Sequence, residues 1–304
     1  MAGKSRCPAP FWRMIMNGWM IGGITVLAAA VAAYANYRRF VHKPTALIEN
    51  PYQVETRSLT VDAGNYALTG QLLIPRGIPG KLPTVIVSHG LNSNAKNAIA
   101  LVGMSLAMSG FQVYCFDFYG GSIHSASGGR MEDMTVFSEK DDLHAVIERI
   151  KQLEATDLEN LFLLGESQGG FVTAITAVDH PEVKGLIEYY PAFCIPEDAR
   201  KRHGSPEKIP EYERFGQSKL GKCYSASVWD YHVYDVISSY CGPVLIIHGD
   251  HDRIVDISYG RRASKVYKQS EFICLPGEIL GFTGAGARKA ASLSYDFMKK
   301  VMKK

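Results

Sequence analysis

The stretch Leu161-Phe162-Leu163-Leu164-Gly165-Glu166-Ser167-Gln168-Gly169-Gly170 determines how the rest of the chain is interpreted. Its four apolar residues predict a short buried strand, and the residues after Ser167 have helical character. A G-x-S-x-G sequence between a strand and a helix is the context of a nucleophile elbow, a strained turn that exposes the serine. The stretch therefore predicts Ser167 as a nucleophile, with the N–H of Gln168 directed at a developing oxyanion.

Segments on both sides of this motif alternate between strand and helix patterns. Two alternating runs joined by Gly64-Asn65 predict an antiparallel hairpin, and the later strands are short apolar runs typical of a sheet covered on both faces. The predicted strands are 54–61, 66–74, 83–88, 111–116, 161–164, 183–189, 244–247 and 272–275, and the predicted helices are 95–108, 143–153, 168–178 and 287–301. This order predicts an α/β fold with a mostly parallel central sheet flanked by helices.

Size and composition are those of a globular protein. The chain has 304 residues, of which 46% are hydrophobic and 21% charged, and this length allows one or two domains. The formal net charge of +3 hides an asymmetry, because the residues before Pro44 contain six Lys and Arg and no acid. The remaining 27 Lys and Arg against 30 Asp and Glu leave the main part mildly acidic, so we expect no nucleic-acid partner.

The N-terminal region has a pattern typical of a membrane anchor. Residues 1–13 form a basic flank, 14–37 carry no charge, and 38–53 look like a linker to the globular part at 54–304. A helix over 14–37 would be roughly 36 Å long, enough to cross a hydrocarbon core of about 30 Å. We predict a transmembrane helix or signal anchor, with the globular part on the extracytoplasmic side, although basic residues on both flanks leave the orientation poorly determined.

Two other interpretations of residues 14–37 stay open. Ala33-Tyr34-Ala35 has the small-x-small form of a signal-peptidase site, which would make the protein secreted after cleavage. The third interpretation is a helix buried in a soluble protein.

The six cysteines do not indicate a compartment or a metal. Cys115 and Cys274 fall in predicted strands, whereas Cys194, Cys223 and Cys241 fall in loop-like sequence. No C-x-x-C or Cys/His spacing suggests zinc, so we expect unpaired structural thiols, no metal and no cofactor.

Four motifs in order resemble the α/β-hydrolase superfamily, in particular its cinnamoyl/feruloyl-esterase-like and serine-aminopeptidase-like branch. The resemblance extends from about residue 54 to 304 and implies an α/β-hydrolase fold with a small lid at about 191–235. It implies a small-molecule ester or a short peptide as substrate. The motifs are His89-Gly90-Leu91-Asn92-Ser93-Asn94, Gly110-Phe111 with Asp117-Phe118-Tyr119-Gly120, Gly165 to Gly170, and His248-Gly249-Asp250-His251-Asp252-Arg253-Ile254-Val255.

The resemblance also implies the roles of individual residues. Ser167 is the implied nucleophile, the backbone N–H of Leu91 is the implied second oxyanion donor beside Gln168, and Asp252 is the implied triad acid. Asp252 follows an apolar strand, which agrees with a place at the carboxyl edge of the sheet. We expect His89 to shape its loop rather than act as a base, and Asp250 to stabilise its turn.

The triad histidine is missing. The family has a Gly-x-x-His-Gly-Phe segment where this chain reads Gly277-Glu278-Ile279-Leu280-Gly281-Phe282, so Leu280 occupies the histidine position. No histidine follows His251, and a serine without an imidazole is a poor nucleophile at neutral pH. A replacement base could come from His251, His248, Glu278 or a histidine of another chain. We favour a degenerate site without a base over each of these replacements.

Three functional hypotheses follow: a carboxylic-ester hydrolase whose activity is weak or lost, an inactive pseudoenzyme that binds a ligand or serves as a scaffold, and a serine peptidase for short peptides. The lid region is rich in aromatic residues, which either line an acyl pocket or pack the lid on the body. These residues are Tyr190, Phe193, Tyr212, Phe215, Tyr224, Trp229, Tyr231 and Tyr234.

Overall fold

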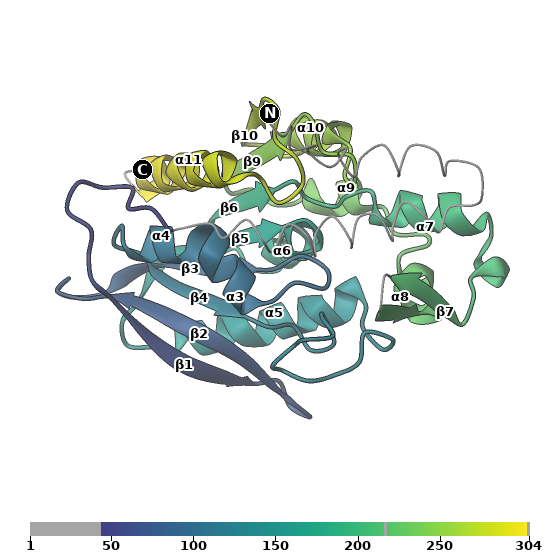
Figure 1. Ribbon diagram of the computed structural model, residues 1–304, viewed down its shortest axis with the longest axis horizontal. Helices are drawn as coiled ribbons and strands as arrows, with labels where there is room; N and C mark the ends of the chain where they lie inside the picture. Colours follow the sequence, from purple (N-terminus) through teal and green to yellow (C-terminus); the bar gives the residue numbers. More distant parts are fainter. Residues whose placement is uncertain (1–43, 216–217, 303–304) are drawn as a thin grey trace, which may run out of the picture.

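The computed structural model describes residues 44–215 and 218–302, and the part of the chain that it describes is organised around a central eight-stranded sheet (Figure 1). The strand order is β1-β2-β4-β3-β5-β6-β9-β10; β1 pairs antiparallel with β2 and β2 with β4, and the other pairs are parallel. The predicted mostly parallel sheet with an antiparallel hairpin at one edge is confirmed. The strands are β1 (Val54–Asp62), β2 (Ala67–Pro75), β3 (Leu82–Ser88), β4 (Gln112–Phe116), β5 (Thr156–Glu166), β6 (Val183–Tyr189), β9 (Val244–Gly249) and β10 (Ser270–Leu275).

Helices cover both faces of this sheet, which explains why its inner strands are mostly apolar. Successive residues of β3 alternate between two cores: Val85 and Val87 pack on one face, and Ile86 packs on the other. One face carries α3 (Ala95–Ala98), a π-helical turn (Ile99–Gly103), α4 (Met104–Ala107) and α11 (Gly284–Met302); the other carries α5 (Val136–Lys151), α6 (Gln168–Ala177), α9 (Val233–Ile237) and α10 (Ile257–Val266).

The predicted lid region forms a small subdomain at one end of the molecule, at the right of Figure 1. Its aromatic side chains largely pack against the body, because the ring centroid of Phe193 lies 6.1 Å from that of Phe171, and the centroid of Tyr231 lies 5.0 Å from that of Phe137. Tyr212 is an exception and is exposed. The subdomain comprises α7 (Ile195–His203), a 3₁₀ turn (Pro206–Lys208), the hairpin β7 (Tyr212–Phe215) and β8 (Ser218–Gly221), and α8 (Lys222–Ser227).

The predicted membrane span at 14–37 lies outside the described residues. Among residues 44–215 and 218–302, no helix is both long enough and apolar enough to cross a membrane.

Several helices differ from the sequence prediction. The predicted helix 95–108 contains the π-helical turn at Ile99–Gly103, and α5 begins at Val136 rather than at 143. Helices α7, α8, α9 and α10 were not predicted. The fully buried residues of α10 are the small Gly260 and Ala263, and Tyr259 and Val266 pack against the same core, so the helix is amphipathic and its pattern was a signal that the prediction missed. Gly260 is required there because a Cβ would lie 2.9 Å from Nδ1 of His248.

Candidate active site

Ser167 lies on a strained turn between β5 and α6. Its backbone has φ 53° and ψ −118°, a conformation that is costly for any residue with a Cβ. Hydrogen bonds hold the turn on both sides: the Ser167 N–H donates to the Tyr189 carbonyl at 2.9 Å, and the Ala192 N–H donates to the Ser167 carbonyl at 2.9 Å. The strand-to-helix elbow predicted from the motif is therefore present, and the Ser167 side chain is partly exposed.

Glycines allow three backbone segments to meet at this turn. A Cβ on Gly165 would overlap the Gly169 carbonyl oxygen, and one on Gly169 would overlap the carbonyl oxygen of Ser88 at the end of β3. A Cβ on Gly90 would lie 3.1 Å from Cβ of Ser167 and 3.7 Å from its Oγ. The end of β5, the start of α6 and the loop after β3 are therefore in direct backbone contact around the Ser167 hydroxyl.

The two predicted oxyanion donors lie at this contact. Leu91 follows Gly90, and Gln168 is the first residue of α6. Within the described residues, neither backbone N–H donates to a protein group. The loop that carries Leu91 is fixed by the Asn92 N–H, which donates to the Gly121 carbonyl at 2.8 Å.

His89 has the loop-shaping place expected for it. Its Nδ1 lies 2.8 Å from the Gly90 carbonyl, and its Nε2 accepts from the Phe118 N–H at 3.2 Å. Both ring nitrogens are therefore occupied by backbone groups, and burial lowers the pKa of the imidazole. A buried neutral ring with no free lone pair cannot serve as the base for Ser167.

Asp252 follows β9, which is separated from β5 in the sheet only by β6, so its loop and Ser167 emerge from the same edge. Its Oδ1 accepts from the N–H groups of Ile254 at 2.9 Å and Val255 at 3.0 Å. Its Oδ2 is buried and has no hydrogen-bond partner in the described structure. Nε2 of His248 lies 3.3 Å away but directs its proton to the Val255 carbonyl at 3.0 Å. Asp252 therefore keeps one buried oxygen that lacks a donor.

Leu280 supplies no donor in its place. Its side chain is partly buried and packs against both hydrophobic cores, and the next two residues, Gly281 and Phe282, have φ values of 83° and 56°. The Phe282 ring is buried with its centroid 4.8 Å from that of Tyr190. Apolar packing therefore holds the segment in which the α/β-hydrolase family has its histidine and this chain has Leu280.

The substitutes considered in the sequence analysis are engaged elsewhere. His251 is exposed and its Nδ1 lies 2.8 Å from Oδ1 of Asp250, which also accepts from the Gly277 N–H at 2.6 Å, as expected for a turn-stabilising residue. The Glu278 carboxylate accepts from the Thr283 N–H at 2.5 Å and the Thr283 hydroxyl at 2.6 Å. Across 44–215 and 218–302, no group forms a hydrogen bond with the Ser167 hydroxyl.

Comparison with known proteins agrees with this fold. Residues 81–226 match the family described as serine aminopeptidase, S33. The structure of Est1E from Butyrivibrio proteoclasticus with bound ferulic acid superposes with a TM-score of 0.74 and 28% identity, covering 81% of this chain and 100% of that one. The chain has the α/β-hydrolase fold. It is similar to the esterase-like and serine-aminopeptidase-like branch of the α/β-hydrolases.

More distant relatives agree on the fold. The α/β-hydrolase domain-containing protein 17C of Xenopus tropicalis is 25% identical over 188 residues, which are 60% of this chain but only half (50%) of that protein. A monoacylglycerol lipase of Paleococcus ferrophilus superposes with a TM-score of 0.57 at 16% identity, over 82% of this chain and 99% of that one. Identity this low shows the shared fold alone.

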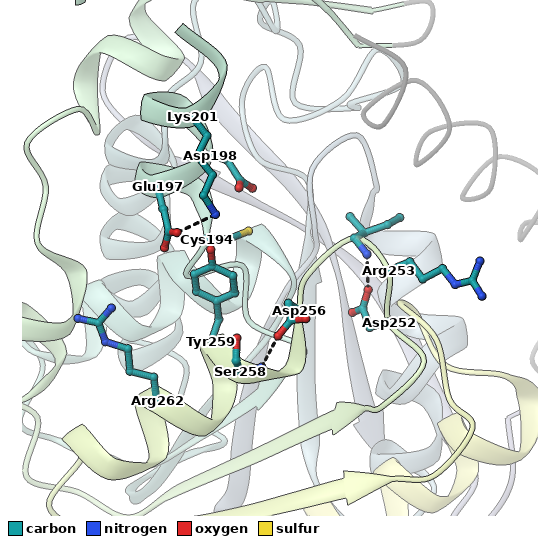
Figure 2. A pocket seen from close by; sticks show the side chains of 11 residues that line it. Cys194, Glu197, Asp198, Lys201, Asp252, Arg253, Asp256, Ser258, Tyr259 and Arg262 are labelled. Atoms are coloured by element: carbon teal, nitrogen blue, oxygen red, sulfur yellow. Dashed lines mark hydrogen bonds and ion pairs between the residues drawn. The ribbon is translucent and has the colours of Figure 1, made fainter. Parts of the chain in front are cut away.

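A cavity of about 700 Å³ lies beside Asp252, between α7 and α10 (Figure 2). Charged side chains line it on both sides: Glu197 and Lys201 pair across one turn of α7 at 2.7 Å, and Arg262 comes from α10. Ser167 does not line this cavity. It is therefore a polar recess next to Asp252 that Ser167 does not reach.

Three buried acids near the sheet edge were missed by sequence reasoning. Burial raises the pKa of Glu139 to about 8, of Glu166 to about 7 and of Glu188 to about 8. Glu166 accepts from the Tyr190 hydroxyl at 3.0 Å, and Glu188 accepts from the Tyr267 hydroxyl at 2.6 Å. The burial of Glu139 could have been predicted from the sequence, because it falls on the apolar face of its helix together with Leu143, Val146 and Ile150.

These acids make stability depend on pH. Their folded-state pKa values lie above the ordinary value of 4.5, so the fold binds protons more tightly than the unfolded chain does. The resulting stabilisation is complete below pH 4.5 and is lost as the pH rises through about 7 to 8. Glu139→Gln should make denaturant-derived free energies of unfolding less steep in this window, by up to about 1.4 kcal/mol per pH unit. The exposed Glu154→Gln is the control, and equal slopes in both variants would contradict the assignment.

The glycine contacts predict a large effect of one methyl group. Gly169→Ala should lower the free energy of unfolding by about 3 kcal/mol or more, because the Cβ overlaps the Ser88 carbonyl in a backbone contact that cannot relax. Gly204→Ala is the control, since Gly204 has φ 74° but no atom within 4 Å of a Cβ, and should cost about 1 kcal/mol. Thermal unfolding followed by circular dichroism measures both. Similar losses would mean that the contact at the elbow is not tight.

Proposed function

We propose that this α/β-hydrolase is of the carboxylic-ester hydrolase type, with Ser167 as nucleophile, Asp252 as triad acid and the N–H groups of Leu91 and Gln168 as oxyanion donors. Its activity is weak because Leu280 stands in place of the base. The observation that carries the proposal is the buried Oδ2 of Asp252, which accepts no hydrogen bond in the described structure and has only Nε2 of His248 nearby, at 3.3 Å. Buried carboxylate oxygens are nearly always hydrogen-bonded, and this one lacks the donor that an imidazole supplies.

The proposed chemistry is acyl transfer. The Ser167 hydroxyl attacks the ester carbonyl, and the two N–H groups stabilise the negative charge that develops on the carbonyl oxygen. Among the described residues no group accepts the hydroxyl proton, so in this proposal it passes to water, and the acyl-enzyme is hydrolysed without a base. Loss of a triad member leaves a residual catalysis of about 10³–10⁴-fold over water. The likeness to Est1E, whose structure holds ferulic acid, supports an ester of an aromatic acid as substrate.

The second candidate is a pseudoenzyme that binds an ester-like or acyl ligand without turning it over. The observation in its favour is the packing of Leu280 against both cores. A serine peptidase acting on short peptides uses the same residues, and the description of the matched family supports it as a further variant of the first candidate.

Leu280→His tests the proposal directly. The introduced imidazole should donate to Oδ2 of Asp252 and take the proton of Ser167. Hydrolysis of p-nitrophenyl acetate should then rise by about 10²-fold or more over the parent. The gain should disappear in the Leu280→His, Ser167→Ala double variant, and Leu280→Gln controls for a polar side chain that cannot act as the base.

Two results would overturn the proposal in different ways. A parent that hydrolyses esters at ordinary enzymatic rates through Ser167, with no gain from Leu280→His, has another base. A folded Leu280→His variant that stays inert favours the pseudoenzyme.

We also propose that residues 14–37 anchor the protein in a membrane. The proposal rests on the uncharged length of this segment and its basic flanks. The full-length protein should stay in the membrane fraction through a carbonate wash, and deletion of residues 1–43 should release a soluble domain with the same thermal unfolding. Release of the full-length protein by the wash, or a mature N-terminus at Asn36, would contradict the anchor.

A further inference from the structure

The side chain of Gln168 joins the nucleophile elbow to two other parts of the fold. Its Nε2 donates to Oε2 of Glu139 in α5 at 2.8 Å, and its Oε1 accepts from the Tyr224 hydroxyl of α8 at 2.6 Å. The exposed fractions of Gln168, Glu139 and Tyr224 are 1%, 1% and 4%. Both ends of the amide are therefore fixed by partners that water does not reach, in a setting where an unpaired group costs about 1–3 kcal/mol.

The lid helix that supplies Tyr224 is itself seated on the body. A Cβ on Gly221 would overlap the Glu132 carbonyl oxygen, so the backbones meet there without a side chain between them. The Cys223 thiol lies 3.3 Å from the same carbonyl. Helix α8 and the segment before α5 therefore form one unit, and this unit reaches Gln168 through the Tyr224 hydroxyl.

The same residue carries the free backbone N–H next to Ser167. Gln168 is the first residue of α6, where the N–H has no partner within the helix. A side chain held at both ends restricts the rotation of its own backbone.

We propose that Gln168 is a positioning residue: Glu139 and the lid residue Tyr224 hold its side chain, and thereby aim its backbone N–H at the oxyanion site. The seating of the lid then determines how well a tetrahedral adduct at Ser167 is stabilised. This inference rests on the proposed function, because it assumes that Ser167 forms such an adduct.

Phenylboronic acid and benzamide separate tetrahedral from planar binding. The Ser167 hydroxyl and the trigonal boronic acid give a tetrahedral serine boronate anion and one proton released to buffer, with a new O–B bond and no redox change. Boron NMR detects the change from trigonal to tetrahedral. Benzamide has a similar size and stays planar, so it reports the pocket without the oxyanion.

Tyr224→Phe is the test variant, and Tyr267→Phe is the matched control. The control removes another buried tyrosine hydroxyl that makes a 2.6 Å bond, to Glu188 of β6, and neither Tyr267 nor Glu188 is a hydrogen-bond partner of the Gln168 side chain. Tyr224→Phe should weaken the binding of phenylboronic acid by about tenfold and the binding of benzamide by less than twofold. Tyr267→Phe should leave the affinities for both ligands unchanged. Equal losses for both ligands, or a selective loss that also occurs in the control, would overturn the inference.

A wild-type protein that forms no tetrahedral adduct contradicts the proposed function, and a second measurement then decides the positioning role. The backbone ¹⁵N order parameter of Gln168 should be near the rigid value of about 0.85 in the wild type and in Tyr267→Phe. It should fall clearly below that value in Tyr224→Phe. An unchanged order parameter in Tyr224→Phe would mean that the lid does not hold this N–H.

Discussion

The contact between Gly169 and the Ser88 carbonyl is the constraint on which the carboxyl edge of the sheet depends. It brings the first turn of α6 against the end of β3, and only a residue without a Cβ allows this approach. Gly165 makes the matching contact within the elbow, and Gly90 lets the next loop lie beside Ser167. Because these backbones touch, the loop that carries Leu91 and the first turn of α6 lie together beside Ser167.

Around this contact the fold places polar groups in surroundings that are otherwise apolar. Glu139, Glu166 and Glu188 are each 0–4% exposed, and each is held by a hydroxyl or an amide. Burial keeps such acids protonated up to a pH near 7 to 8, so they accept hydrogen bonds without introducing a buried charge. The side chains at the elbow are therefore specified by directional bonds where apolar packing alone would leave alternatives.

The sequence predicted the parts of the fold whose signal is local. The strands and α6 appear as apolar runs and a glycine motif, and the elbow at Ser167 follows from residues that are neighbours in the chain. The bridge from Glu139 through Gln168 to Tyr224 joins residues 29 and 56 positions apart, so no local pattern shows it. The hairpin of β7 and β8 was also missed, because its strands have only four residues each and take their order from packing on the body.

The structure also shows which of the predicted site residues are required for the fold itself. Asp252 would be needed even in a protein without catalysis, because its Oδ1 fixes the turn through two backbone N–H groups. His89 and Gln168 likewise make bonds that the fold requires. None of these three therefore distinguishes an enzyme from a binding protein. Ser167 does, because its hydroxyl bonds to no group in the described structure while its backbone carries the strain of φ 53°. A glycine would adopt that conformation at lower cost, so the Ser167 side chain does not stabilise the fold. Its role must therefore lie in an interaction with a ligand at the elbow.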